Sequence, residues 1–112
     1  MSLTITSHVS SGSVVLNLSG RLCFMEMALR EQITAFLSEG QREFVLNMAE
    51  LSHIDSFGLG QLVAIWTSIR NKNGHMKLVQ PSEKVRKLLE ITKLDTVFQI
   101  ESEQSASEAS RT

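Results

Sequence analysis

Hydrophobic and polar residues alternate along the first twenty positions of the chain, the pattern of β-strands that bury one face. Two alternating stretches, residues 3–9 and 13–19, are separated by Ser10-Ser11-Gly12, a sequence that favours a tight turn. We therefore expect an antiparallel hairpin at the start of the chain.

After the hairpin the apolar spacing becomes helical. The apolar residues that recur every three or four positions are Met25, Leu29, Ile33, Phe36 and Leu37. Gly40 is expected to end this first helix. A strand over residues 43–48 follows, in which the apolar run Phe44–Leu46 predicts burial on both faces of a sheet. Met25 and Met27 together with Met48 and Met76 suggest an adaptable binding surface, but Met25, Met48 and Met76 fall at expected core positions, which favours packing.

The second half of the chain repeats this alternation of helix and strand. A helix is predicted from about Phe57, with Leu59, Leu62, Val63, Trp66 and Ile69 on its apolar face, and Asn73-Gly74 ends it. Residues 76–79 predict a strand, and Pro81-Ser82 starts a helix carrying Val85, Leu88 and Leu89. Residues 96–100 predict a last short strand.

The predicted order is β-β-α-β-α-β-α-β, which is that of an α/β fold. Strands separated by helices favour parallel pairing through right-handed crossovers, so we expect a mixed central sheet of about five strands. The 112 residues fit a single domain, 1–112, and the Ser- and Glu-rich tail, 101–112, either forms a short helix over residues 102–109 or frays.

Charge, cysteine content and the lack of long apolar stretches disfavour nucleic-acid-binding, disulfide-stabilised, secreted and membrane-spanning proteins. The net charge is −1, and the cluster Lys84, Arg86, Lys87 and Lys93 predicts a solvated helix face rather than a nucleic-acid surface. The single cysteine, Cys23, excludes an internal disulfide and fits a packing role in a reducing cytosol. No secretory signal or membrane-spanning stretch is evident, so we expect a cytoplasmic protein without membrane insertion.

The segment Asp55-Ser56-Phe57-Gly58-Leu59-Gly60 carries the chemistry of the chain, because it sets an acid and a hydroxyl where a strand turns into a helix. We expect Ser56 at or next to the helix N-cap, held in place and accessible. The residues alone leave open whether Asp55 or Ser56 only caps the helix, and whether Phe57 is an exposed interface anchor or tucks under the preceding loop.

Other chemistry is disfavoured. Ser56 with His53 and Asp55 suggests a serine hydrolase, but the Gly-x-Ser-x-Gly pattern is missing. The glycines make no phosphate-binding loop, and the three histidines lack metal-ligand spacing, so no cofactor or metal is expected.

The chain resembles the STAS domain of bacterial anti-sigma factor antagonists in three consecutive features. These are the short strand, a segment similar to the pattern Asp-Ser-(small)-Gly-Leu-Gly, and the mostly apolar helix. Further stretches extend the resemblance over roughly residues 3–100: Leu16–Leu22, Gly74–Leu78, Val85–Leu94 and Val97-Phe98. The chain departs from the family's pattern at Cys23, where an Asp is usual, and at Phe57, where Ser or Thr is usual.

The resemblance implies a non-enzymatic regulator that works by partner switching. Ser56 would be phosphorylated by an anti-sigma factor with serine kinase activity and reset by a PP2C-type phosphatase, and Asp55, Phe57, Gly58, Leu59 and Cys23 would shape the partner surface. The same family includes non-catalytic subunits of larger assemblies, such as transporters and stress-sensing complexes, which is the alternative function.

Overall fold

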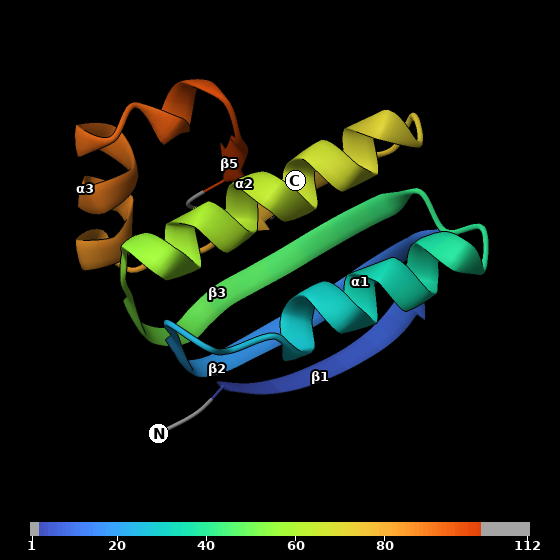
Figure 1. Cartoon of the computed structure of the whole chain (residues 1–112), viewed down its shortest axis with the longest axis horizontal. Coiled ribbons are helices and arrows are strands. Elements are labelled where there is room, and N and C mark those ends of the chain that lie inside the picture. Colours follow the sequence, from blue (N-terminus) through green and yellow to red (C-terminus); the bar gives the residue numbers. More distant parts are fainter. Residues whose placement is uncertain (1–2, 102–112) are drawn as a thin grey trace, which may run out of the picture.

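The computed structural model describes residues 3–101 of the chain. Five strands, three α-helices and one short 3-10 helix follow in the order β1 (Leu3–Ser10), β2 (Ser13–Leu22), α1 (Ala28–Ser38), β3 (Glu43–Ile54), α2 (Ser56–Asn71), β4 (His75–Val79), α3 (Glu83–Ile91), η1 (Leu94–Thr96) and β5 (Gln99–Glu101) (Figure 1). The predicted order of strands and helices is confirmed, and the predicted helix over residues 102–109 lies outside the described residues.

The strands form one mixed sheet in the order β1-β2-β3-β4-β5. β1 pairs antiparallel with β2, and the remaining neighbours pair in parallel. The hairpin turn uses positive φ at Ser11 (52°) and Gly12 (83°), a conformation that suits the twist of the flanking strands. The predicted hairpin and mixed sheet are therefore confirmed.

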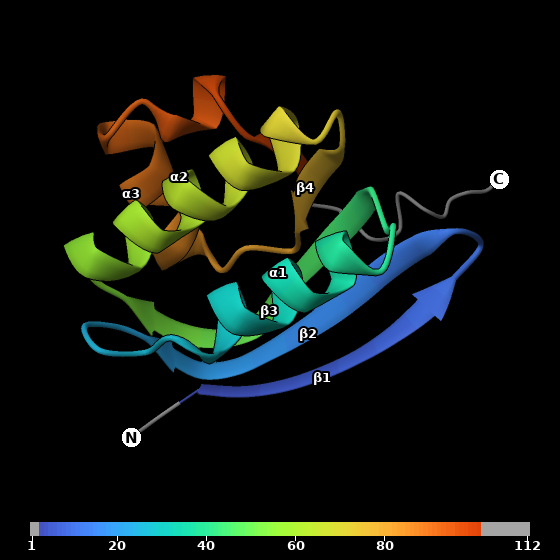
Figure 2. The same ribbon diagram turned by 45° about the vertical axis from the view of Figure 1, so that its right-hand side comes forward.

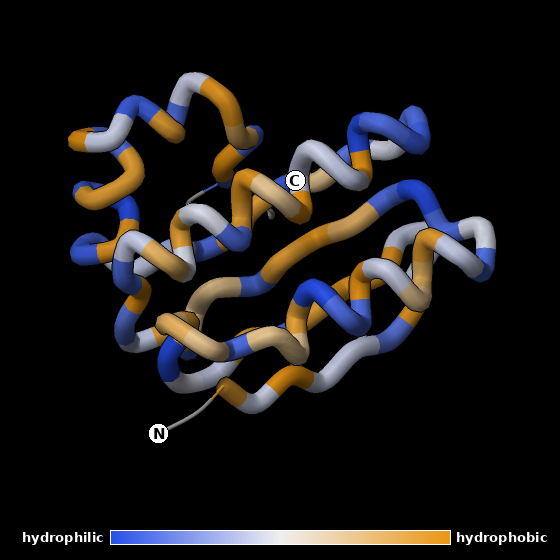
Figure 3. The backbone as a smooth tube through the Cα atoms, viewed as in Figure 1, coloured by the Kyte–Doolittle hydropathy of each residue, from blue (hydrophilic) through white to orange (hydrophobic). Residues whose placement is uncertain are grey.

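One face of the sheet carries the core. Helices α1 and α2 lie side by side over this face, and α3 lies beside the start of α2 (Figures 1 and 2). Alternate residues of β2, β3 and β4 are buried beneath them: Val14, Leu16, Leu18, Phe44, Leu46, Met48, Met76 and Leu78. Figure 3 shows the hydrophobic positions recurring along β3 and the helices.

The prediction that Phe44–Leu46 is buried on both faces is wrong. Phe44 and Leu46 are buried, but Val45 points to the opposite face and is half-buried, beside half-buried Asn47. Among the described residues no helix covers this opposite face (Figure 2), so the strand needs apolar residues only at alternate positions.

The first helix begins at Ala28 instead of Met25. The backbone N–H of Glu26 donates to the carbonyl of Cys23 at 3.1 Å, and Met25 has a φ of 74°, so the chain makes a tight turn there. Met25 is 76% exposed, and the prediction that it lies in the core is wrong. Met48 and Met76 are buried as predicted.

Two strands differ in extent from the prediction. β3 runs six residues past Met48, to Ile54, because β2 also continues to Leu22 and the two strands stay paired through register shifts. At the other end of the chain, residues 94–96 form the 3-10 helix, and β5 begins only at Gln99. Phe98 is buried and makes a T-shaped contact with Trp66, the ring centroids 6.4 Å apart.

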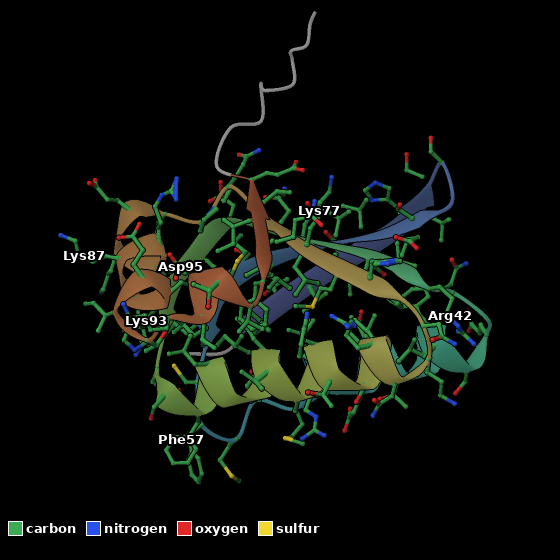
Figure 4. All side chains as sticks on the ribbon, turned by 90° about the horizontal axis from the view of Figure 1, so that it is seen from above. Arg42, Phe57, Lys77, Lys87, Lys93 and Asp95 are labelled. Carbon is green, nitrogen blue, oxygen red and sulfur yellow. The ribbon has the colours of Figure 1, made fainter. Side chains whose placement is uncertain are left out.

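The basic cluster lies on the surface, but only Lys84, Arg86 and Lys87 belong to α3, and Lys93 follows its end. Lys84, Lys87 and Lys93 are exposed and Arg86 is half-buried (Figure 4 labels Lys87 and Lys93). In the described part of the chain, no helix has the length and apolar character needed to span a bilayer.

Candidate functional site

The junction between β3 and α2 places Ser56 on the surface. β3 ends at Ile54, and Asp55 is the N-cap of α2, with extended backbone (φ −110°, ψ −175°). Oδ1 of Asp55 accepts a hydrogen bond from the backbone N–H of Gly58 at 2.9 Å. Ser56 is the first residue of α2 and is exposed. The predicted position next to the N-cap is confirmed, and Asp55 supplies the capping oxygen.

Asp55 also ties the start of α2 to the end of β2. Its second carboxylate oxygen, Oδ2, accepts from the backbone N–H of Phe24 at 3.3 Å. Its own backbone N–H donates to the carbonyl of Leu22 at 3.4 Å. A single residue therefore fixes the turn after β2 against the first turn of the helix.

The same hydrogen bonds set the charge of the site. The N–H of Gly58 makes the largest contribution to holding the pKa of Asp55 below its ordinary value, and partial desolvation opposes it. The backbone N–H groups of Phe24 and Phe57 and the nearby His53 lower this pKa further. Asp55 is consequently a carboxylate at neutral pH and places a negative charge beside the Ser56 hydroxyl.

Gly58 lets the helix pack directly on the strand ends. A Cβ at this position would lie 2.2 Å from the carbonyl oxygen of Leu22 and 2.7 Å from Cγ1 of Ile54. Leu59 is also buried, at 8% exposure. Both residues were predicted to shape a contact surface, but the structure buries them next to exposed Ser56 and Phe57.

Phe57 points outward, so the alternative that it tucks under the preceding loop is wrong, and its role as an interface anchor stays a prediction. It is 57% exposed and packs on Phe24, itself 60% exposed, with ring centroids 4.6 Å apart at an interplanar angle of 56°. Figure 4 shows Phe57 projecting away from the body of the molecule. Cys23, the residue before Phe24, is half-buried.

Sequence reasoning missed part of this surface. Three exposed apolar residues come from the turn after β2 and one from the start of α2, and we call them the apolar patch: Phe24, Met25, Met27 and Phe57. A helical period assigned Met25 to the core. The available signal was the run Phe24-Met25-Glu26-Met27, in which three of four consecutive residues are apolar, so they do not follow the three- or four-residue spacing of one helix face.

The described residues bring no metal-binding group together. No group of three or more His, Cys, Asp or Glu side chains in residues 3–101 is placed to hold a metal ion. Both Asp55 oxygens accept from backbone N–H groups, so this carboxylate is committed to the turn and the helix start. A hollow of about 220 Å³ involves Ser13, Glu43, His75 and Gln99, and none of the junction residues lines it.

Known proteins share both the sequence pattern and the fold. The model of the STAS domain family matches residues 4–107. A Thermotoga maritima protein assigned as an anti-sigma factor antagonist is 40% identical over 65 residues, a match spanning 58% of each chain. The anti-sigma-B factor antagonist of Bacillus subtilis is 24% identical over 101 residues, which cover 89% of this chain and 92% of that protein.

Solved structures of related proteins share this fold. The crystal structure of the Thermotoga maritima protein has a TM-score of 0.81 at 29% identity and covers 93% of this chain and 91% of its own. The Bacillus cell fate determinant SpoIIAA, solved in its phosphorylated form, has a TM-score of 0.69 at 23% identity, with 98% and 100% coverage. The match over nearly the whole chain and the shared mixed sheet with its helices lead to one conclusion: the chain belongs to the STAS domain family.

Proposed function

We propose that this protein is an anti-sigma factor antagonist whose binding is controlled by phosphorylation of Ser56. The observation that carries the proposal is the position of Ser56, exposed as the first residue of α2 beside the capping Asp55. Relatives of the same family support it, because one is named an anti-sigma-B factor antagonist and another was solved in a phosphorylated form.

The junction tolerates a phosphate. Phosphorylation would add about −1.5 to −2 charges and three acceptor oxygens at neutral pH. The positive end of the α2 dipole favours an anion at this position, and the carboxylate of Asp55 opposes it. We therefore expect the fold to persist, with the modification acting through the surface that a partner meets.

In the proposed cycle, the unmodified protein binds an anti-sigma factor that has serine kinase activity. The kinase transfers a phosphoryl group from ATP to the Ser56 hydroxyl, the modified protein dissociates, and a PP2C-type phosphatase removes the phosphate. The catalytic groups belong to these partners. This chain supplies the acceptor hydroxyl, and the two carboxylate oxygens of the neighbouring Asp55 accept from backbone N–H groups.

Mass spectrometry tests the proposal. The protein would be incubated with ATP and a lysate of its source cells and then analysed by intact mass and peptide mapping, beside Ser56→Ala. Ser52→Ala is a matched control, since Ser52 is another exposed serine on the same junction, at the end of β3. We expect a phosphoryl-sized gain on Ser56 in the wild type and in Ser52→Ala, and none in Ser56→Ala. A gain that persists in Ser56→Ala would contradict the proposal.

The second candidate is a constitutive, non-catalytic subunit of a larger assembly. The observation that favours it is Phe57, an exposed aromatic ring directly after Ser56. Under this alternative the ring would hinder a kinase instead of anchoring it. In that case the protein stays unmodified, and Ser56→Ala retains its partner with unchanged affinity.

A further inference from the structure

The apolar patch stands beside the phosphoacceptor that we propose. We infer that Phe24, Met25, Met27 and Phe57 form the contact that gives the kinase partner its affinity, and that Asp55 is the positioning residue that holds Phe24 in this contact. The inference rests on the proposed function, because it assigns the partner that phosphorylates Ser56 to this surface.

The patch differs from the other exposed apolar residues because Phe24 and Phe57 pack together, and Met25 and Met27 follow Phe24 in the same turn. The remaining large ones among residues 3–101 are Val9 on β1, Ile91 at the end of α3 and Val97 after η1, each on a separate element. Single exposed apolar residues are ordinary on protein surfaces, whereas a contiguous patch marks an interaction site. Aromatic residues and Met are also the types enriched at the centre of protein interfaces.

The aromatic pair is held ready for binding. The Phe24 and Phe57 rings lie 4.6 Å apart, in a tilted contact that joins the turn after β2 to the start of α2. Large rings that are already packed lose little conformational freedom when a partner covers them, so such groups often dominate binding energy.

Two carboxylates hold the turn that carries the patch. Oδ2 of Asp55 accepts from the N–H of Phe24 at 3.3 Å, and Oε1 of Glu26 accepts from the N–H of Leu3 at 3.2 Å. The turn is thereby attached to α2 on one side and to β1 on the other. Asp55 is the attachment that sets Phe24 against Phe57.

The chemistry of the patch defines the kind of partner. Residues 22–29 and 54–60 contain no basic side chain, and their two acidic residues, Glu26 and Asp55, both accept from backbone N–H groups. The surface therefore fits an apolar groove. Any kinase that reaches the Ser56 hydroxyl must also meet Phe57, the next residue, so the apolar contact is continuous with the contact at Ser56.

This arrangement gives the switch its direction. A phosphate on Ser56 would lie at the border of an apolar contact, and docking would strip water from a dianion. The unmodified protein binds and the phosphorylated one is released, with no rearrangement of the fold required.

Calorimetric titration against the purified kinase that modifies Ser56 tests the patch. Phe24→Ala and Phe57→Ala should each weaken binding by about tenfold or more, as residues at the centre of an interface do. Ile91→Ala is the matched control, since Ile91 is 70% exposed and lies outside the patch, and its affinity should stay within about twofold of wild type. Urea unfolding confirms that each variant is folded.

A double-mutant cycle tests the role of Asp55. In Asp55→Asn one oxygen still accepts from Gly58, but the amide nitrogen cannot accept from the N–H of Phe24. We expect this variant to bind less tightly than wild type, and to cause no further loss in the Phe24→Ala background. An equal loss in both backgrounds would overturn the positioning role.

The outcomes separate the two levels of the proposal. If Ser56 is phosphorylated but Phe24→Ala and Phe57→Ala bind like wild type, the patch inference fails and the proposed function stands. If neither modification nor a Ser56-sensitive partner is found, both fail. A concentration-dependent dimer in sedimentation that Phe24→Ala abolishes would assign the patch to a second copy of the chain and overturn the inference.

Discussion

The two ends of α2 meet the sheet in the same way but present different surfaces. At the start, a Cβ on Gly58 would lie 2.2 Å from the carbonyl oxygen of Leu22, and just beyond the end, a Cβ on Gly74 would lie 2.4 Å from that of Arg42. Both glycines therefore allow backbone to approach backbone. Close packing explains both positions without reference to function.

The surfaces above these glycines are unlike. At the start of α2, an exposed serine precedes Phe57, which packs on Phe24 in the apolar patch. Near the end, His75 and Glu43 are exposed, with His75 Nδ1 3.0 Å from Glu43 Oε2, as is ordinary on a solvated surface. The exposed aromatic pair has no counterpart there, so the fold itself does not require it. We attribute the difference to the partner binding proposed above.

The largest expected effect tests the similarity of the two ends. Gly58→Ala and Gly74→Ala should each lower the free energy of unfolding by about 2 kcal/mol, since backbone atoms must move to admit a methyl group. Urea titrations measure both changes. Only Gly58→Ala should also weaken binding of the kinase, and similar binding losses in the two variants would remove the distinction between the ends.

A smaller effect on stability tests the difference between the ends. Phe57→Ala removes an exposed ring that contacts Phe24, so the free energy of unfolding should fall by only about 0.5–1 kcal/mol while kinase affinity drops about tenfold. His75→Ala, at the other end, should alter stability by less than about 0.5 kcal/mol and leave binding unchanged. A loss of binding in His75→Ala would place the partner surface elsewhere.

The smallest effect concerns pH. Asp55 has a pKa in the folded state below its ordinary value of 3.8, chiefly because it accepts from the N–H of Gly58. Its ionised form is thus favoured by folding, and this contribution to stability is fully present above pH 3.8 and lost as pH falls through the folded-state pKa. Unfolding titrations from acid to neutral pH should show a shallower pH dependence for Asp55→Asn. Parallel profiles for the two proteins would contradict this assignment.

Local patterns were enough to predict the framework and the centre of the site. The alternation of apolar and polar residues predicted the hairpin, and the helical spacing of apolar residues predicted the three helices. The preference of Asp and Ser for helix N-termini predicted that Asp55 and Ser56 lie at the start of α2. Each of these features depends mainly on residues within a few positions of one another.

Features that depend on distant residues were not predictable. Met25 fits the helical period, but the chain turns there, and Asp55 holds that turn through Phe24 from 31 residues away. β3 continues to Ile54 through polar positions because β2 remains alongside it. The orientation of Phe57 likewise follows from Phe24, whose position the local sequence does not reveal.

The most direct measurement compares two forms of the protein against one partner. The unmodified chain and a chain carrying phosphoserine at position 56, introduced during synthesis, would be titrated separately into the purified anti-sigma factor kinase. We predict that the unmodified chain binds and that phosphorylation weakens binding by about tenfold or more, through the charge added beside the apolar patch. Equal affinity for the two forms would contradict a phosphorylation-controlled switch at Ser56.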